Sequence, residues 1–123
     1  MPVLGLDHVN IRTMDVVRSA KFYVDVFDFE FRQGGFTMGQ QSNWLFDKAG
    51  RAIIHLRVLE AEAGSTGPID HVALACDGMQ EILERLGVLG VAFSVFENPD
   101  QPITQVFLKD PHGVPLELSF SRA

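Results

Sequence analysis

The chain has 123 residues, of which 46% are hydrophobic and 21% charged, and this fits one globular domain or two half-sized modules that share a core. A formal net charge of −6 with only ten Lys and Arg residues argues against a nucleic-acid partner, and no apolar run approaches the roughly 20 residues that span a bilayer. A single cysteine, Cys76, excludes an intrachain disulfide, and with no signal-peptide pattern before Leu4 we expect a cytoplasmic protein.

The first module is predicted to occupy residues 3–59. Residues 4–12 alternate between apolar and polar side chains, which indicates a strand, and Thr13 or Asp15 then caps a helix. The apolar stripe of that helix comprises Val16, Val17, Ala20, Tyr23, Val24 and Phe27. Three further strands are predicted at 29–32, 43–47 and 52–59, with Gly34-Gly35 and residues 48–50 as turns.

The same order repeats after a small polar segment at 60–68, which we interpret as a linker. The second module, residues 69–121, opens with a strand at 69–76 and a helix at 78–89 that Gly90 can end. The helix carries apolar residues at helical spacing, namely Met79, Ile82, Leu83 and Leu86. Three strands follow, at 91–96, 103–109 and 114–120, with a hairpin turn at 110–113. Each module is therefore β-α-β-β-β, so the sequence predicts an α+β fold.

The two modules share a short motif at the start of their first strands. Leu6-Asp7-His8-Val9 is matched 63 residues later by Ile69-Asp70-His71-Val72. Two equivalent histidines in a duplicated fold suggest one shared site, and a metal ion is the first candidate.

A second pair of polar residues, His55 and Glu117, lies in apolar strand segments at nearly corresponding places. The turns before them match at an offset of 63, from Asp47 to Asp110, whereas His55 and Glu117 are 62 residues apart. The first hairpin therefore has one extra residue, and a β-bulge is needed to put His55 on the face that Glu117 occupies.

Three imidazoles and one carboxylate form a donor set that suits Zn, Ni, Fe, Mn or Co, with further positions open to water or substrate. The alternative for any single histidine is a hydrogen-bonded packing residue. An unpaired buried Glu is costly, which favours the metal. We expect His112, in a predicted turn, to be a solvated loop residue.

These residues carry a resemblance to the vicinal oxygen chelate superfamily, which includes glyoxalase I, bleomycin-resistance proteins, extradiol dioxygenases, fosfomycin-resistance enzymes and methylmalonyl-CoA epimerase. The resemblance covers essentially the whole chain and implies one domain, residues 1–123, whose two modules form a cup-shaped mixed sheet. It also implies a homodimer whose paired modules close barrels, with His8 and His55 of one chain facing His71 and Glu117 of the other. The matching segments are Leu6–Val9, Ala20–Tyr23, Val26–Phe29, Ile69–Val72 and Phe107–Leu118.

By this resemblance, His8, His71 and Glu117 match the three common metal positions. His55 matches a fourth position that is typically Glu or Gln in the glyoxalase and epimerase branches. It could complete the metal shell or act beside it as a base near neutral pH. Asp28 stands where the family usually has glycine, and Asp tolerates the left-handed conformation at modest cost.

Strand alternation predicts the remaining pocket residues. Asn10 and Arg12 share the face of His8, and Arg57 shares that of His55. Arg12 offers a bidentate anchor for a carboxylate, or else it is a surface charge or an intersubunit ion pair. Gln105 and Phe107 are expected to point into the same cup, and Trp44 is expected in the core or the pocket wall. Ala73 and Ala75 leave room beside His71.

The resemblance implies a metal-dependent enzyme for a small substrate with vicinal oxygens. Glyoxalase-I-like proton transfer, a lyase or isomerase reaction with Glu117 or His55 moving the proton, uses the filled quartet best. An extradiol-type dioxygenase acting on a catechol is an alternative, because His8, His71 and Glu117 form its facial triad. A metal-free ligand-binding protein of the bleomycin-resistance type is another. The fosfomycin branch fits poorly, because Phe107 stands where a tyrosine hydroxyl is expected.

Overall fold

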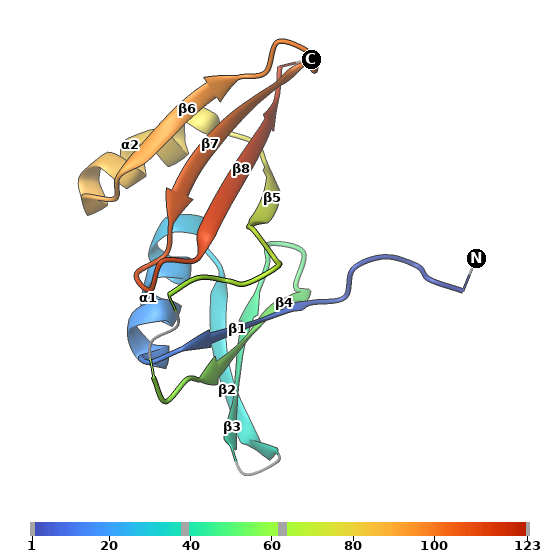
Figure 1. Cartoon of the computed structure of the whole chain (residues 1–123), viewed down its shortest axis with the longest axis vertical. Coiled ribbons are helices and arrows are strands. Elements are labelled where there is room, and N and C mark those ends of the chain that lie inside the picture. Colours follow the sequence, from blue (N-terminus) through green and yellow to red (C-terminus); the bar gives the residue numbers. More distant parts are fainter. Residues whose placement is uncertain (1, 38–39, 62–63, 123) are drawn as a thin grey trace. The chain divides into compact units, whose positions relative to one another are not determined.

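The structure, a computed structural model, describes residues 2–37, 40–61 and 64–122. It consists of two compact units, Met1–Glu62 and Ala63–Ala123, whose boundary falls inside the segment predicted as a linker (Figure 1). Each unit contains one helix and a four-stranded mixed sheet in the order β-α-β-β-β, so the predicted α+β fold of two tandem modules is confirmed.

The first unit has the strand order β1-β4-β3-β2. The first and last strands in the sequence are parallel neighbours, and the other pairs are antiparallel. The elements are β1 (Val9–Thr13), α1 (Val16–Phe27), β2 (Glu30–Thr37), β3 (Gln40–Phe46) and β4 (Ala52–Val58).

The second unit repeats this topology with the order β5-β8-β7-β6, again with its first and last strands parallel. The elements are β5 (Val72–Cys76), α2 (Met79–Leu89), β6 (Phe93–Glu97), β7 (Ile103–Lys109) and β8 (Pro115–Ser121). Neither helix in the described part of the chain is long and apolar enough to cross a membrane.

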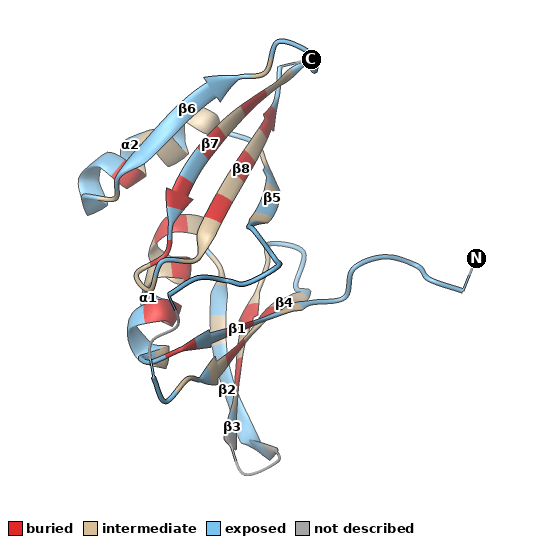
Figure 2. Cartoon of the chain, in the orientation of Figure 1, coloured by how far each residue is buried: buried red, intermediate tan, exposed pale blue. Residues whose placement is uncertain are grey.

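Strands of both sheets bury alternate residues on one face and leave the other face, here called the open face, accessible. Along β1, Ile11 and Thr13 are buried while Asn10 and Arg12 are exposed. Buried residues alternate in the same way along β7 and β8 (Figure 2). Burying one aliphatic side chain contributes about 1.5–3 kcal/mol, so this alternation fixes the facing of the polar residues between. The buried apolar residues are Ile11, Ala20, Tyr23, Val26, Leu45, Ile54, Leu56, Leu86, Val106, Leu108, Leu116, Leu118 and Phe120.

The ends of α1 follow from local hydrogen bonding. Asp15 is the N-cap, because its carboxylate accepts a hydrogen bond from the backbone N–H of Arg18 at 3.0 Å. Asp28 ends the helix in the left-handed conformation with φ 59°, the tolerance expected of Asp at this position. The predicted apolar stripe was partly wrong: Val17 is 71% exposed, whereas Ser19 and Val26 are buried. The buried residues of α1 are Ser19, Ala20, Tyr23 and Val26, and the helix packs on β2, β3 and β4.

Several predicted strand limits are corrected. Residues 4–8 and 69–71 precede the strands rather than forming them, because the parallel pairing with β4 and β8 begins only at Val9 and Val72. Gly34 and Gly35 lie within β2 instead of forming a turn. They form an irregularity in the β2–β3 ladder, between the pairs Gln33–Asn43 and Phe36–Gln41. The predicted turn was wrong because a glycine pair serves a bulged strand as well as a turn.

The two equivalent hairpin turns use the same chemistry. The carboxylate of Asp47 accepts a hydrogen bond from the backbone N–H of Arg51 at 2.9 Å, and that of Asp110 accepts one from Val114 at 3.0 Å. Gly50 and Gly113 close these turns with φ of 80° and 88°, which favour glycine. The hydrogen bond from Arg51 lowers the pKa of Asp47, so the carboxylate stays ionised as an acceptor.

The predicted β-bulge is present. In the β3–β4 ladder the register shifts after Leu45–Ile54, so that Phe46 pairs with Ala52 and Ile53 is the extra residue. The β7–β8 ladder has no such shift. With the bulge, Asn10 pairs with His55 just as Ala73 pairs with Glu117.

Candidate metal centre

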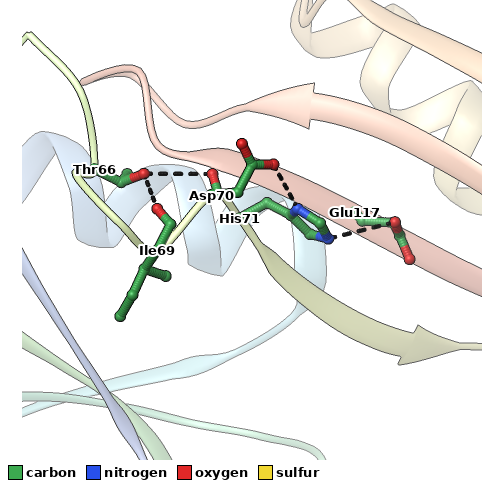
Figure 3. Close-up of polar contacts among 5 residues, drawn as sticks. All are labelled: Thr66, Ile69, Asp70, His71 and Glu117. Carbon is green, nitrogen blue, oxygen red and sulfur yellow. Dashed lines mark hydrogen bonds and ion pairs between the residues drawn. The ribbon is translucent and has the colours of Figure 1, made fainter.

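The second unit brings His71 and Glu117 together on its open face. His71 directly precedes β5, and its Nδ1 donates a hydrogen bond to Asp70 Oδ2 at 2.8 Å (Figure 3). The other ring nitrogen, Nε2, lies 3.6 Å from Oε1 of Glu117. The side chain of Asp70 is 93% exposed, whereas that of Glu117 is only 13% exposed. The ring of His71 therefore lies between a carboxylate in solvent and a carboxylate shielded on the sheet.

Thr66 anchors the segment that leads into this site. Its hydroxyl donates a hydrogen bond to the carbonyl oxygen of Ile69 and lies 3.4 Å from the carbonyl oxygen of Asp70 (Figure 3). These contacts fix the backbone before His71. No sequence pattern indicates this role of Thr66, because the residue lies in the small, polar segment at 60–68.

The electrostatics of His71 favour positive charge. The hydrogen bond to Asp70 raises the pKa of His71, with further contributions from the charges of Glu117 and Asp70, while desolvation opposes the rise. A proton and a metal cation are thus attracted by the same two carboxylates.

The first unit has an equivalent arrangement at His8, immediately before β1. Its Nδ1 donates to Asp7 Oδ1 at 2.7 Å, and the Asp7 side chain is 92% exposed. The His8 ring meets Trp44 edge to face at 4.8 Å between centroids. Both repeated histidines therefore use Nδ1 for an aspartate and leave Nε2 as the nitrogen that can coordinate a metal.

His55 lies on the same open face but is held differently. Its ring is stacked on Trp44, with centroids 4.3 Å apart and planes 7° apart, and its centroid is 6.4 Å from that of His8. The Nδ1 atom lies 3.2 Å from Nδ2 of Asn10. Desolvation lowers the pKa of His55, and the charges of Arg57 and His8 lower it further. The lowered pKa favours the neutral form of His55.

Two arginines lie beyond these histidines on the same face. Arg12 of β1 and Arg57 of β4 are direct neighbours in the parallel register. Within residues 2–37, 40–61 and 64–122, neither has a carboxylate partner. In contrast, Arg32 is paired with Glu30 at 2.9 Å and stacks on Phe46 at 4.2 Å. Two adjacent guanidinium groups on one face favour an anionic ligand there.

On the open face of the second unit, small side chains lie beside Glu117. Ala73 and Ala75 are exposed, and Ala73 is the register partner of Glu117. On the other side of β8, Phe107 pairs with Glu117 and is 38% exposed. Gln105 is half-buried and accepts a hydrogen bond from Asn98 Nδ2 at 3.2 Å.

The prediction for His112 was wrong in one respect. The residue lies in the predicted turn, but it is half-buried, and its Nε2 is enclosed without a hydrogen-bond partner in the described part of the chain. The backbone N–H of His112 donates to Asp110 Oδ1 at 2.9 Å, which fixes the backbone of the turn at this residue.

These donors fit a divalent transition metal. Imidazoles whose second nitrogen donates to a carboxylate are typical metal ligands, and a mixture of imidazole and carboxylate suits first-row ions. Of the four predicted ligands, each unit brings two together, and no cluster of three or more His, Cys, Asp or Glu side chains suited to a metal occurs among the described residues.

Comparisons with known proteins identify the family. A comparison with curated proteins gives no match. Among solved structures, a glyoxylase/bleomycin resistance protein/dioxygenase domain from Frankia sp. EAN1pec is similar with a TM-score of 0.79 at 21% identity, covering 98% of this chain and 93% of that one. FosX, a fosfomycin resistance protein from Listeria monocytogenes, has a TM-score of 0.75 at 18% identity, covering 98% and 99%. A mutant FosX was solved with Mn(II) and 1S,2S-dihydroxypropylphosphonic acid, with a TM-score of 0.73 at 18% identity and coverage of 98% and 94%. At these identities the likeness concerns the fold.

The sequence itself matches the Glyoxalase/Bleomycin resistance protein/Dioxygenase superfamily over residues 5–118, which is most of its length and includes both histidine motifs and Glu117. The chain belongs to that superfamily.

Proposed function

We propose that the protein is a metal-dependent enzyme that catalyses proton transfer on a small oxygenated substrate, in the manner of glyoxalase I. The observation that carries this proposal is the repeated carboxylate–imidazole pair. Asp7 and Asp70 each hold a histidine through Nδ1, and Glu117 lies 3.6 Å from the Nε2 that His71 presents. A protein that only sequesters a ligand has no need of such a set.

His8, His71 and Glu117 are the residues that hold the ion in this proposal. When bound, a divalent ion of the group Zn, Ni, Fe, Mn and Co supplies a Lewis acid that polarises vicinal oxygens of the substrate. The carboxylate of Glu117 is also the natural carrier for the transferred proton, because its side chain is 13% exposed and therefore shielded from bulk water.

The adjacent arginines give the substrate class. Arg12 and Arg57 can bind a carboxylate or a similar anionic group at one end of the open face. Asn10 lies between His8 and Arg12 along the chain, and Trp44 contacts the rings of His8 and His55. In the second unit Phe107 is the register neighbour of Glu117, and Gln105 lies two residues before Phe107 on β7. We therefore propose a small substrate with vicinal oxygens at one end and an anionic group at the other.

We propose that the complete site forms in a homodimer. His8 and His55 of one chain would face His71 and Glu117 of a second chain. The support is that each unit brings together only two of these four side chains. His8 and His71 each donate Nδ1 to an aspartate, and the strands that follow them have matching registers.

Metal content and turnover test the proposal together. We expect purified protein to contain stoichiometric metal by elemental analysis and to turn over methylglyoxal–thiol adducts with Ni(II). His71→Ala should lose the metal, and His112→Ala, which removes an imidazole outside the proposed site, should keep it. Protein that lacks metal as isolated and after reconstitution, with His71→Ala no different from wild type, would refute the proposal. Tight binding of a small ligand after complete chelation would then favour a metal-free binding protein.

One observation favours a second candidate, an extradiol-type dioxygenase. His55 is held by Asn10 and Trp44, so a triad of two imidazoles and a carboxylate remains, with positions open for substrate and oxygen. The same preparation reconstituted with Fe(II) and supplied with catechols distinguishes the two. Ring cleavage without glyoxalase activity would select the dioxygenase.

A further inference from the structure

Three imidazoles lie on the open faces, and one of them has a different kind of partner. His8 and His71 direct Nδ1 at carboxylates, which can only accept hydrogen bonds. His55 directs Nδ1 at the amide nitrogen of Asn10, which can only donate, at 3.2 Å. The partner of Nδ1 is therefore a hydrogen-bond donor at His55 and a hydrogen-bond acceptor at His8 and His71.

The partner decides where the single proton of a neutral imidazole sits. A carboxylate holds the proton on Nδ1 and leaves the lone pair of Nε2 for a metal. An amide N–H donating to Nδ1 leaves the proton on Nε2, which is then a hydrogen-bond donor and cannot coordinate a cation. By this argument His8 and His71 are prepared as ligands, and His55 is prepared as a donor.

The sheet holds His55 in this state from both sides. Asn10 is its register neighbour on β1, and Trp44 is its register neighbour on β3, where the two rings stack at 4.3 Å. The stacking on Trp44 restrains the plane of the ring, and the contact with Asn10 selects the edge of the ring that carries Nδ1.

The repeat shows that this restraint belongs to position 55 alone. The corresponding neighbours of Glu117 are Ala73 and Phe107, and neither side chain can hydrogen-bond. Glu117 instead faces Nε2 of His71. Where the second unit pairs Ala73 with Glu117, the first unit pairs Asn10 with His55.

We propose that Asn10 fixes His55 as the tautomer protonated on Nε2, so that His55 donates a hydrogen bond to a substrate oxygen and is neither a metal ligand nor the base. This inference rests on the proposed metal-dependent function. His55 is then the catalytic electrophile, in the way a neutral imidazole polarises a carbonyl group. Asn10 is its positioning residue, and the transferred proton is left to Glu117.

The tautomers can be read directly in the metal-free protein. Long-range 1H–15N correlation spectra of protein labelled at histidine distinguish the two nitrogens at about pH 8, above the ordinary imidazole pKa. We expect the proton on Nδ1 in His8 and His71 and on Nε2 in His55. A proton on Nδ1 of His55 would mean that the amide oxygen of Asn10 faces the ring, and it would overturn the proposal.

Metal affinity provides a second readout. Co(II) is titrated into metal-free protein in competition with a chelator, and circular dichroism confirms that each variant is folded. His55→Ala should change the affinity by less than about 3-fold, whereas His71→Ala should lower it by about 100-fold or more. An equal loss in the two variants would make His55 a ligand and refute the inference.

Asn10→Asp is the informative substitution, because it gives His55 the partner that His8 and His71 have. The proton should move to Nδ1, and Nε2 should join the metal shell, raising Co(II) affinity about 10-fold or more. The added negative charge alone also attracts the cation, so the control is Asn10→Asp combined with His55→Ala. An equal gain in the double variant would show a charge effect only and contradict the proposal.

The two hypotheses fail in different ways. If wild type and His71→Ala both fail to bind Co(II), the proposed function fails. If wild type binds Co(II) but His55 is protonated on Nδ1, only the inference about Asn10 fails.

Discussion

The aspartate that precedes each repeated histidine determines which ring nitrogen is available. Asp7 and Asp70 lie in solvent, yet each accepts a hydrogen bond shorter than 3 Å from its neighbour's Nδ1. An exposed pair of this kind contributes little to the free energy of folding. Its role at the site is instead to fix the orientation of the histidine ring. The role is readable in the sequence only because the same dipeptide occurs twice.

Removing the charge of Asp70 tests this role. In Asp70→Asn we expect metal affinity at about pH 8 to fall by about 10- to 100-fold, the usual effect of losing the carboxylate that accepts a hydrogen bond from a metal-binding histidine. Asp100→Asn, which neutralises a loop carboxylate of the same unit, is the control and should leave the affinity unchanged. A Co(II) titration measures both, and equal affinities in the two variants would argue that Asp70 does not orient His71.

The raised pKa of His71 sets the pH range of metal binding. Protonation removes the lone pair, so affinity falls as the pH falls, and because the pKa is raised the loss begins above the ordinary imidazole range. In metal-free protein the same shift stabilises the folded state at low pH, and this contribution is lost as the pH rises through the folded-state pKa. Metal binding measured across the range from about pH 5 to 9 should show this onset, and in Asp70→Asn the onset should move to lower pH.

At the scale of elements, the bulge in β4 compensates for the extra residue of the first hairpin. Ile53 has no partner in the β3 ladder and no counterpart in β8. Deleting it gives a strand with the regular register of β8, in which His55 keeps its neighbours Asn10 and Trp44.

We therefore expect the Ile53 deletion to fold with a loss of less than about 2 kcal/mol in the free energy of unfolding. The tautomer spectrum of His55 should be unchanged. Deleting Leu116 from the unbulged β8 is the matched control and should cost much more, because it slips the register and removes a buried side chain. Urea unfolding compares the two, and equal losses would contradict the assignment of Ile53 as a tolerated insertion.

Strand alternation and the internal repeat were enough to predict most of this framework. The Asp–Gly turns and the facing of Asn10 and Arg12 follow from periods and offsets in the sequence. The offsets also show where a bulge is needed, and the residue types before the helix limit its cap to Thr13 or Asp15, of which the structure uses Asp15. These features depend on interactions close in the chain or on a repeat of known length.

What could not be predicted depends on contacts between distant segments or on residues compatible with two structures. Gly34 and Gly35 suit a bulged strand as well as a turn. The burial of His112 depends on how its hairpin folds back. The contact between Asn10 and His55 required the parallel register of β1 and β4, which no local pattern encodes.

At the scale of the whole molecule, the question is which chains supply the side chains that bind the metal. If the site combines His8 of one chain with His71 of another, a two-fold dimer contains two such sites. A mixture of His8→Ala and His71→Ala chains then restores one intact site in each mixed dimer, where both pure variants have none.

We expect an equimolar mixture, after subunit exchange, to bind about a quarter of the metal bound by wild type, because half of the dimers are mixed and each has one intact site. Elemental analysis of the dimer fraction measures this. A mixture that binds no more metal than the separate variants would place all donors of a site in one chain.

The register correspondence between the two units has a consequence for how such a chain can diverge. Three open-face positions of the first unit have register equivalents in the second. The equivalent of Asn10 is Ala73, that of Trp44 is Phe107 and that of His55 is Glu117. Three substitutions, Asn10→Ala, Trp44→Phe and His55→Glu, would make the two copies chemically alike at these positions. The insertion at Ile53 lies outside this set, because the bulge absorbs it without turning a side chain. An insertion and a change of open-face residues can therefore occur independently in the two modules. A chain whose two modules carry the same open-face residues could be designed from this fold.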